Sequence, residues 1–186
     1  MKGSKIVSEL IMEMKEKVIF DFNDESQLEN WYNINDEVMG GKSTGNIKFI
    51  KSGLACFSGN ISLLNNGGFS AVRAHQLPKK IKDSYSAVTF KVLGDGKTYS
   101  FRIKTSTGMD GINYKADFET INEQWQTITL YFKDFIPVYR GKKVEDAPLL
   151  DSQDIKQVGL LIANKQMGAF SIFVDWIKFL NFPVVN

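Results

Sequence analysis

The stretch from Asn35 to Arg73 holds the densest group of side chains that could do chemistry. It begins Asn-Asp-Glu-Val-Met-Gly-Gly-Lys-Ser and ends Asn-Asn-Gly-Gly-Phe-Ser-Ala-Val-Arg, so paired glycines stand beside polar and charged residues at both ends. Glycine pairs favour tight turns and allow other groups to approach the backbone closely. Two interpretations are open from these residues: two structural turns, or a recognition surface formed by two loops.

The segment Gly41-Lys42-Ser43 matches the end of a phosphate-binding loop. The complete motif needs a glycine five positions before Gly41, where this chain has Asp36, and it lies between a strand and a helix. Here the surrounding pattern is typical of strands, and an aspartate would repel phosphate. We therefore expect no nucleotide site at this loop.

A single histidine and a single cysteine limit the catalytic chemistry that the chain can support. His75 alone cannot provide the imidazoles of the common zinc sites, and Cys56 alone cannot form an internal disulfide or a multi-cysteine cluster. No serine sits in a Gly-x-Ser-x-Gly nucleophile elbow between a strand and a helix. We expect a protein that is not an enzyme and holds no metal or cofactor. The enzymatic alternative uses His75 or a pair of carboxylates from Asp36, Glu37, Asp95 and Asp117.

The arginines Arg73, Arg102 and Arg140 stand in apolar or aromatic stretches of the sequence. In such surroundings a guanidinium needs a carboxylate, backbone carbonyls or a ring face as a partner. The sequence predicts a salt bridge between Asp36 and either Arg73 or Arg102. Such a bridge would join the two glycine loops.

Alternation of apolar and polar residues with a period of two begins near Lys17 and continues along the chain. About ten short strands separated by turn signals predict an all-β fold, an antiparallel β-sandwich or jelly roll. We expect residues 17–186 to form one domain. Before it, the apolar spacing of Ile6, Leu10 and Met14 predicts a short amphipathic helix over residues 4–16.

The 186 residues carry 23 basic and 21 acidic side chains, a net charge of +2. Because no long basic run is present, we expect no nucleic-acid partner. No apolar run approaches the roughly 20 residues that span a bilayer, so we expect no direct insertion into a membrane. Glu9, Glu13 and Glu16 interrupt what would be the apolar part of a secretory signal. These features predict a cytoplasmic protein.

A carbohydrate-binding module is a second interpretation, because jelly rolls rich in aromatic residues can bind sugars. Such a module needs an exposed aromatic platform beside polar side chains. We expect Trp31, Trp125 and Trp176 to lie in the core instead, as tryptophans of β-sandwiches usually do.

An ordered series of motifs resembles the complex I intermediate-associated protein 30 family. The series runs over about residues 18–180 and includes Asn35-Asp36-x-Val38-Met39-Gly40-Gly41-x-Ser43, Phe57-x-Gly59, Asn65-Asn66-Gly67-Gly68-Phe69 with Arg73, Gly94-Asp95-Gly96 with Tyr99 and Arg102, Trp125-Gln126, Phe135, Arg140-Gly141, and Gly159-Leu160 with Gln166 and Phe170.

The resemblance implies a galactose-binding-like jelly roll with a non-catalytic binding role. Mitochondrial members of this family are assembly chaperones for respiratory complex I. The resemblance therefore implies a protein partner among the subunits of a membrane-associated redox complex. The partner or ligand surface that we expect comprises Asp36, Met39, Gly40, Gly41, Ser43, Asn65, Asn66, Gly67, Gly68, Phe69, Arg73, Arg102 and Arg140.

Overall fold

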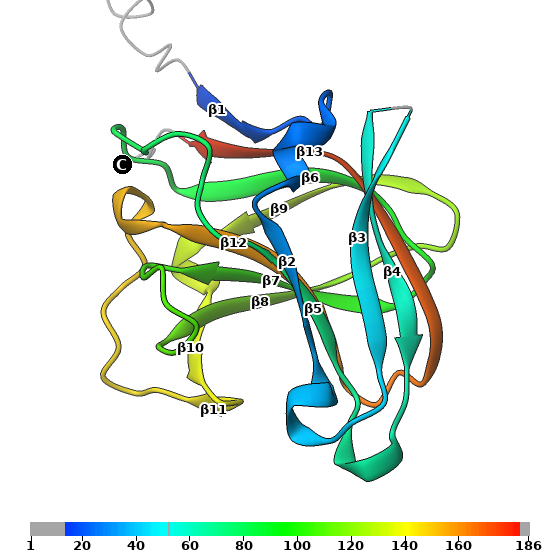
Figure 1. Cartoon of the computed structure of the whole chain (residues 1–186). Coiled ribbons are helices and arrows are strands. Elements are labelled where there is room, and N and C mark those ends of the chain that lie inside the picture. Colours follow the sequence, from blue (N-terminus) through cyan, green and yellow to red (C-terminus); the bar gives the residue numbers. More distant parts are fainter. Residues whose placement is uncertain (1–13, 52, 183–186) are drawn as a thin grey trace, which may run out of the picture.

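The computed structural model describes residues 14–51 and 53–182 as two antiparallel sheets that pack face to face (Figure 1). The predicted all-β antiparallel sandwich is confirmed. Strands distant in sequence lie side by side throughout, so few of the pairings in either sheet are between consecutive strands.

The first sheet is organised around the 14-residue strand β13. This strand pairs with β6 on one side, and on the other side with β4 and then β1. The strand order is β3-β4-β13-β6-β9, with β1 added beside β13. The bounds are β1 (Lys15–Phe20), β3 (Thr44–Ile50), β4 (Leu54–Ile61), β6 (Ala87–Leu93), β9 (Trp125–Tyr131) and β13 (Gly168–Asn181).

The second sheet has seven strands in the order β11-β10-β8-β7-β12-β5-β2. Its bounds are β2 (Trp31–Asn35), β5 (Ser70–Ala74), β7 (Thr98–Lys104), β8 (Asn113–Glu119), β10 (Ile136–Tyr139), β11 (Lys142–Lys143) and β12 (Gln157–Ile162).

Helical structure in the described residues consists of 3-10 turns of three or four residues. They are η1 (Glu25–Leu28), η2 (Asp36–Met39), η3 (Leu64–Asn66), η4 (Phe132–Asp134) and η5 (Ser152–Asp154). Within residues 14–51 and 53–182, no helix has the length and apolar character needed to cross a bilayer.

The core lies between the sheets and follows from the alternation of residues along each strand. On β7, Phe101 points inward and stacks on Phe90 of β6, with ring centroids 4.9 Å apart. Phe118 of β8 meets the same Phe90 ring edge-on at 5.0 Å. Because successive side chains of a strand point to opposite faces, Arg102 on β7 must point to the outer face of the second sheet. The packing of the core thus places Arg102, one of the expected site residues, on the outside of the sandwich.

The predicted N-terminal helix over residues 4–16 falls largely outside the described residues. The prediction is wrong for the last two residues of this range, because Lys15 and Glu16 begin β1 and pair with Asn181 and Leu180 of β13. Short helices are marginal by themselves in water. Pairing with the long central strand therefore decides the conformation of these two residues.

Candidate functional site

The two glycine loops meet around the carboxylate of Asp36, which follows β2 directly. Its Oδ1 accepts a hydrogen bond from the backbone amide of Ser43 at 2.9 Å, and its Oδ2 accepts from the amides of Gly68 at 2.6 Å and Phe69 at 3.2 Å. Asp36 is only 1% exposed. Figure 1 shows the β2–β3 and β4–β5 connections, light blue and green, side by side at the lower end of the molecule.

Electrostatics favours the ionised form of this buried carboxyl group. Burial by itself would raise the pKa of Asp36, but hydrogen bonds from Ser43, Gly68 and Phe69 outweigh it and hold the pKa below its ordinary value. The loops therefore join around a carboxylate that stays charged at neutral pH.

Each glycine pair contributes one left-handed residue and one close approach to Asp36. Gly40 and Gly68 have φ of 84° and 135°, conformations that side chains disfavour. A Cβ at Gly41 would overlap the Asp36 side chain, and a Cβ at Gly67 would lie 2.6 Å from Oδ2. The space around one carboxylate therefore explains Gly41 and Gly67, and the backbone conformation explains Gly40 and Gly68.

Further polar contacts extend this network between the same two loops. Asn65 Nδ2 donates to the carbonyl of Gly40 at 3.0 Å. Ser43 Oγ accepts from the amide of Ser62 at 3.0 Å and donates to its carbonyl at 3.2 Å. Asn66 has φ of 58°, a conformation that asparagine tolerates. These contacts fix the loop geometry and, through it, the positions of nearby exposed side chains.

The predicted salt bridge from Asp36 to Arg73 or Arg102 is wrong. The ion pairs found among the described residues do not include Asp36, whose partners are backbone amides. Converging amides of a tight loop can satisfy a carboxylate without a cation. The two loops are joined, but the arginines lie on the outer face of the second sheet.

Arg73 and Arg102 occupy one row across that outer face. Tyr32 of β2 pairs with Arg73 of β5, which pairs with Gly159 of β12; Gly159 pairs in turn with Arg102 of β7, which pairs with Lys115 of β8. The two arginines thus flank a glycine, with one strand between them.

The two arginines of this row form part of the floor of a cavity of about 670 Å³, which we call the outer cleft. That volume lies in the range of small-ligand sites. The outer cleft is lined by Ile34, Met39, Phe69, Ala71, Val72, Arg73, Arg102, Met109, Asp110, Gly111, Asn113, Val138, Tyr139, Arg140, Gly141, Leu160, Leu161 and Ala163.

The structure divides the expected site residues into two groups. Five of them line the outer cleft: Met39, Phe69, Arg73, Arg102 and Arg140. The others belong to the loop network beside it: Asp36, Gly40, Gly41, Ser43, Asn65, Asn66, Gly67 and Gly68.

Several cleft residues escaped the sequence reasoning, among them Asn113, Leu161 and Tyr139. Period two places Leu161 on the same face of β12 as Gly159, which is the available sequence signal. Which strands are neighbours depends on the register of the sheet, and that register brings Val138 opposite Asn113.

A loop held by a buried lysine forms one wall of the outer cleft. Lys104 is fully buried, and its Nζ donates to the backbone carbonyls of Gly108, Met109 and Asp110. Burial lowers the pKa of Lys104, nearby Arg73 adds to that effect, and Asp110 opposes it. Lys104 therefore positions Met109 and Asp110 at the cleft.

The β10–β11 hairpin forms the facing rim. Arg140 and Gly141 have φ of 48° and 80°, the conformation of a two-residue hairpin turn. The Arg140 guanidinium lies over the ring of Tyr139 at 5.2 Å, and its Nη2 is 3.6 Å from Oδ1 of Asp110. Both partners of this ion pair are largely exposed, so the pair stabilises the rim only weakly.

The residues of the enzymatic alternative are not gathered at the outer cleft. His75 is exposed and stacks on Tyr32, with ring centroids 4.1 Å apart. Asp95 accepts hydrogen bonds from the Tyr99 hydroxyl at 3.1 Å and the Ser171 amide at 2.9 Å. In the described part of the chain, no group of three or more metal-ligating side chains is arranged to hold a cation.

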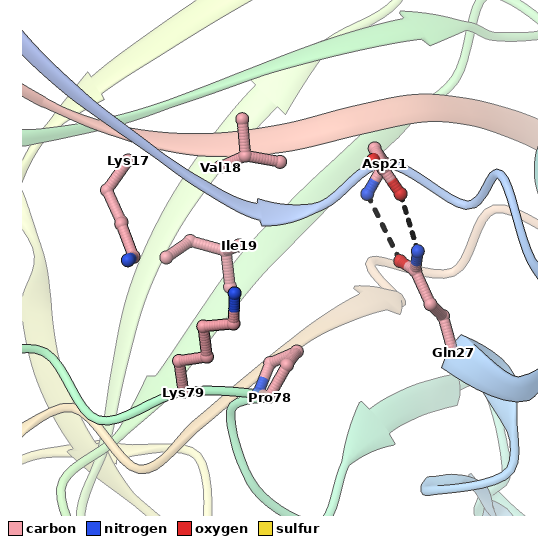
Figure 2. A pocket seen from close by; sticks show the side chains of 7 residues that line it. All are labelled: Lys17, Val18, Ile19, Asp21, Gln27, Pro78 and Lys79. Carbon is pink, nitrogen blue, oxygen red and sulfur yellow. Dashed lines mark hydrogen bonds between the residues drawn. The ribbon is translucent and has the colours of Figure 1, made fainter.

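A smaller hollow of about 310 Å³ lies beside β1 and is shown in Figure 2. Asp21 and Gln27 exchange two hydrogen bonds there: the Asp21 amide donates to Gln27 Oε1, and Gln27 Nε2 donates to Asp21 Oδ1. Lys17 and Lys79 line the other side. Asp21, the carboxylate among the described residues that line this hollow, is thus engaged within its own loop.

Comparison with known proteins decides the family. The model of the family "Complex I intermediate-associated protein 30" matches residues 20–174. The chain belongs to this family. The resemblance drawn from the sequence motifs is therefore confirmed.

The share of each relative's length that this chain covers differs between relatives. A protein of Schizosaccharomyces pombe is 29% identical over 181 residues, which cover 82% of this chain and 80% of the relative. The mitochondrial complex I intermediate-associated protein 30 of Drosophila melanogaster is 22% identical, over 86% of this chain and 61% of the relative. The chain thus spans about three-fifths of the fly protein.

Among solved structures, a family 11 carbohydrate-binding module from Clostridium thermocellum, in complex with a mixed-linked tetrasaccharide, has a TM-score of 0.64 to this family member. The two share 21% identity over 89% of this chain and 95% of the module. At this identity the likeness shows a common fold.

The comparison with relatives corrects the expected cytoplasmic location, because the fly relative is a mitochondrial protein. The sequence argument considered secretory signals, and the absence of one carries no information about mitochondrial import.

Proposed function

We propose that this chain is a non-catalytic assembly factor that binds a protein partner during the construction of respiratory complex I in mitochondria. The observation that carries the proposal is membership of the complex I intermediate-associated protein 30 family over residues 20–174. The fly relative bears the family name and is mitochondrial.

The outer cleft supports a binding role. Its lining is mostly apolar with a few polar groups, the composition of a recognition site. Met39, which is 77% exposed, and Phe69 reach it from the two glycine loops. The Asp36 network thus contributes to the cleft indirectly, because it fixes the loops that carry these two side chains.

Carbohydrate binding is less well supported by the aromatic side chains. Tyr139 stands at the cleft rim, but the Arg140 guanidinium covers one face of its ring. Trp31 is buried, as expected, whereas Trp125 is 44% exposed. The expectation for Trp125 was wrong because the alternation along β9 turns Ile128 and Leu130 toward the core and Trp125 to the outer face of the first sheet, where Lys91 lies over the indole ring at 5.1 Å.

The proposal is tested by deleting the gene in the native host and separating respiratory complexes on native gels. We expect depleted complex I with accumulated subassemblies, restored by the wild-type gene. Affinity purification of the tagged chain should recover complex I subunits. Normal levels of all respiratory complexes together with no recovered protein would contradict the proposal.

A further inference from the structure

Arg73 and Arg102 form an unusual pair in the floor of the outer cleft. They lie in one cross-strand row with Gly159 between them. A Cβ at Gly159 would overlap the Val72 carbonyl and lie 3.1 Å from the Arg73 Cα. Glycine is therefore required by the close approach of the Val72 carbonyl, and no side chain of β12 stands between the two arginines in this row.

Both arginines lack a carboxylate partner within 4.0 Å among the described residues. Arg73 is 9% exposed, and its hydrogen-bond partner is the neutral Oδ1 of Asn113 at 2.9 Å. The Nε of Arg102 is buried and has no hydrogen-bond partner. Arg102 as a whole is half-buried. Guanidinium nitrogens withdrawn from water are costly unless an acceptor satisfies them, so this pair points to an anion.

The two acidic residues near Arg73 and Arg102 each interact with another cation. Asp110 pairs with Arg140 at 3.6 Å, and Asp117 accepts a hydrogen bond from Lys115 at 3.1 Å. Lys104 is satisfied by three backbone carbonyls. Arg140 also lines the cleft but faces Asp110, so Arg73 and Arg102 are the two cleft arginines without a carboxylate within 4.0 Å among the described residues.

The walls above the pair are apolar. Met39 and Phe69 contribute from the glycine loops, Leu161 from β12, and Val138 and Tyr139 from β10. A ligand that satisfies the arginines must also cover this surface, so an anion without an apolar part would leave the walls in contact with water.

We propose that the outer cleft binds a carboxylate carried beside an apolar side chain on a peptide segment, with Arg73 and Arg102 holding the carboxylate. The planar guanidinium fork matches the geometry of a carboxylate. A monoanion suits the site better than a phosphate dianion, because Asp110 lines the cleft and Asp117 lies near Arg102. The choice of a peptide rests on the proposed function.

The test uses the full chain labelled with ¹⁵N and titrated with four probes. They are the capped dipeptide acetyl-Phe-Glu-amide, its neutral analogue acetyl-Phe-Gln-amide, 3-phenylpropionate and inorganic phosphate. We expect the acidic dipeptide to shift the amide signals of Gly159 and Asn113 and to bind at least tenfold more tightly than the other three.

Variants assign the effect to the arginines. Arg102→Lys keeps the charge but removes the fork, and Arg73→Gln removes the charge; each is expected to weaken binding about tenfold, which corresponds to about 1.4 kcal/mol. Lys48→Gln, on the exposed surface of β3 in the other sheet, removes one positive charge as a matched control and should leave binding unchanged. Thermal unfolding verifies that each variant is folded.

The outcomes separate this inference from the proposed function. Equal binding of the acidic and neutral dipeptides overturns the carboxylate site, as does preferential binding of phosphate. Binding of 3-phenylpropionate as tightly as the dipeptide overturns the peptide assignment. If the variants still recover complex I subunits from the host while no carboxylate binds, the inference fails and the proposed function stands. If carboxylates bind but complex I assembles normally without the gene, the inference stands and the proposed function fails.

Discussion

The Asp36 carboxylate accepts a 2.6 Å hydrogen bond from the backbone amide of Gly68, a residue 32 positions further along the chain. This contact joins the β2–β3 loop to the β4–β5 loop, and those loops deliver Met39 and Phe69 to the outer cleft. Gly41 and Gly67 of this chain are thereby explained by the space that one buried carboxylate needs.

Replacement of this carboxylate by its amide should destabilise the fold. In the wild type, Oδ1 and Oδ2 of Asp36 accept hydrogen bonds from three backbone amides. In Asp36→Asn an NH₂ group replaces one of these oxygens and faces at least one of those amides, donor against donor. The expected loss is about 1.5–3 kcal/mol of unfolding free energy, the range for hydrogen bonds to a charged group. Urea unfolding at pH 7 measures it, with the neighbouring exposed Glu37→Gln as the control. A loss under about 0.5 kcal/mol, the size of an ordinary surface substitution, would show that the network is dispensable.

The same carboxyl group makes part of the stability depend on pH. The pKa of Asp36 is lowered in the folded chain, so its stabilising contribution is complete above the pKa of the unfolded chain, about 4. It is lost as the pH falls through the lower pKa of the folded chain. The difference in unfolding free energy between wild type and Asp36→Asn should therefore be constant from pH 5 to 7 and shrink below pH 4. A difference that grows in acid would reverse the assigned direction.

A methyl group at Gly67 should disturb the Asp36 network directly. Gly67 has φ of −69°, so alanine is not strained there, but its Cβ would lie 2.6 Å from Asp36 Oδ2. Overpacking of this kind costs about 1–3 kcal/mol. Gly108→Ala is the matched control, because its Cβ would meet nothing closer than 3.9 Å. Equal unfolding temperatures of the two variants would argue against close packing around Asp36.

Loss of the Lys104 ammonium should loosen the wall of the outer cleft. Lys104→Met keeps most of the buried stem but leaves the carbonyls of Gly108, Met109 and Asp110 without this donor. We expect about 1–3 kcal/mol of destabilisation and faster amide hydrogen exchange over residues 106–111. Lys48→Met, at an exposed position, should change neither quantity. Unchanged exchange in Lys104→Met would mean that other contacts hold the loop.

The sequence by itself determined the sandwich, because period-two alternation on strands such as β7 separates the inward Phe101 from the outward Arg102. It also marked the glycine pairs and the arginines as residues with special roles. It failed at Lys15 and Glu16, where pairing with β13 overrides a weak local preference for helix.

Only the tertiary structure decided which of these residues act together. Asp36 is bound by the amides of Ser43, Gly68 and Phe69, whereas Arg73 and Arg102 meet on another face. The physical reason is that a charge pattern along the chain specifies residue types but not their neighbours. The register of β5, β12 and β7 brings the arginines to either side of Gly159, and no local spacing in the sequence encodes that register.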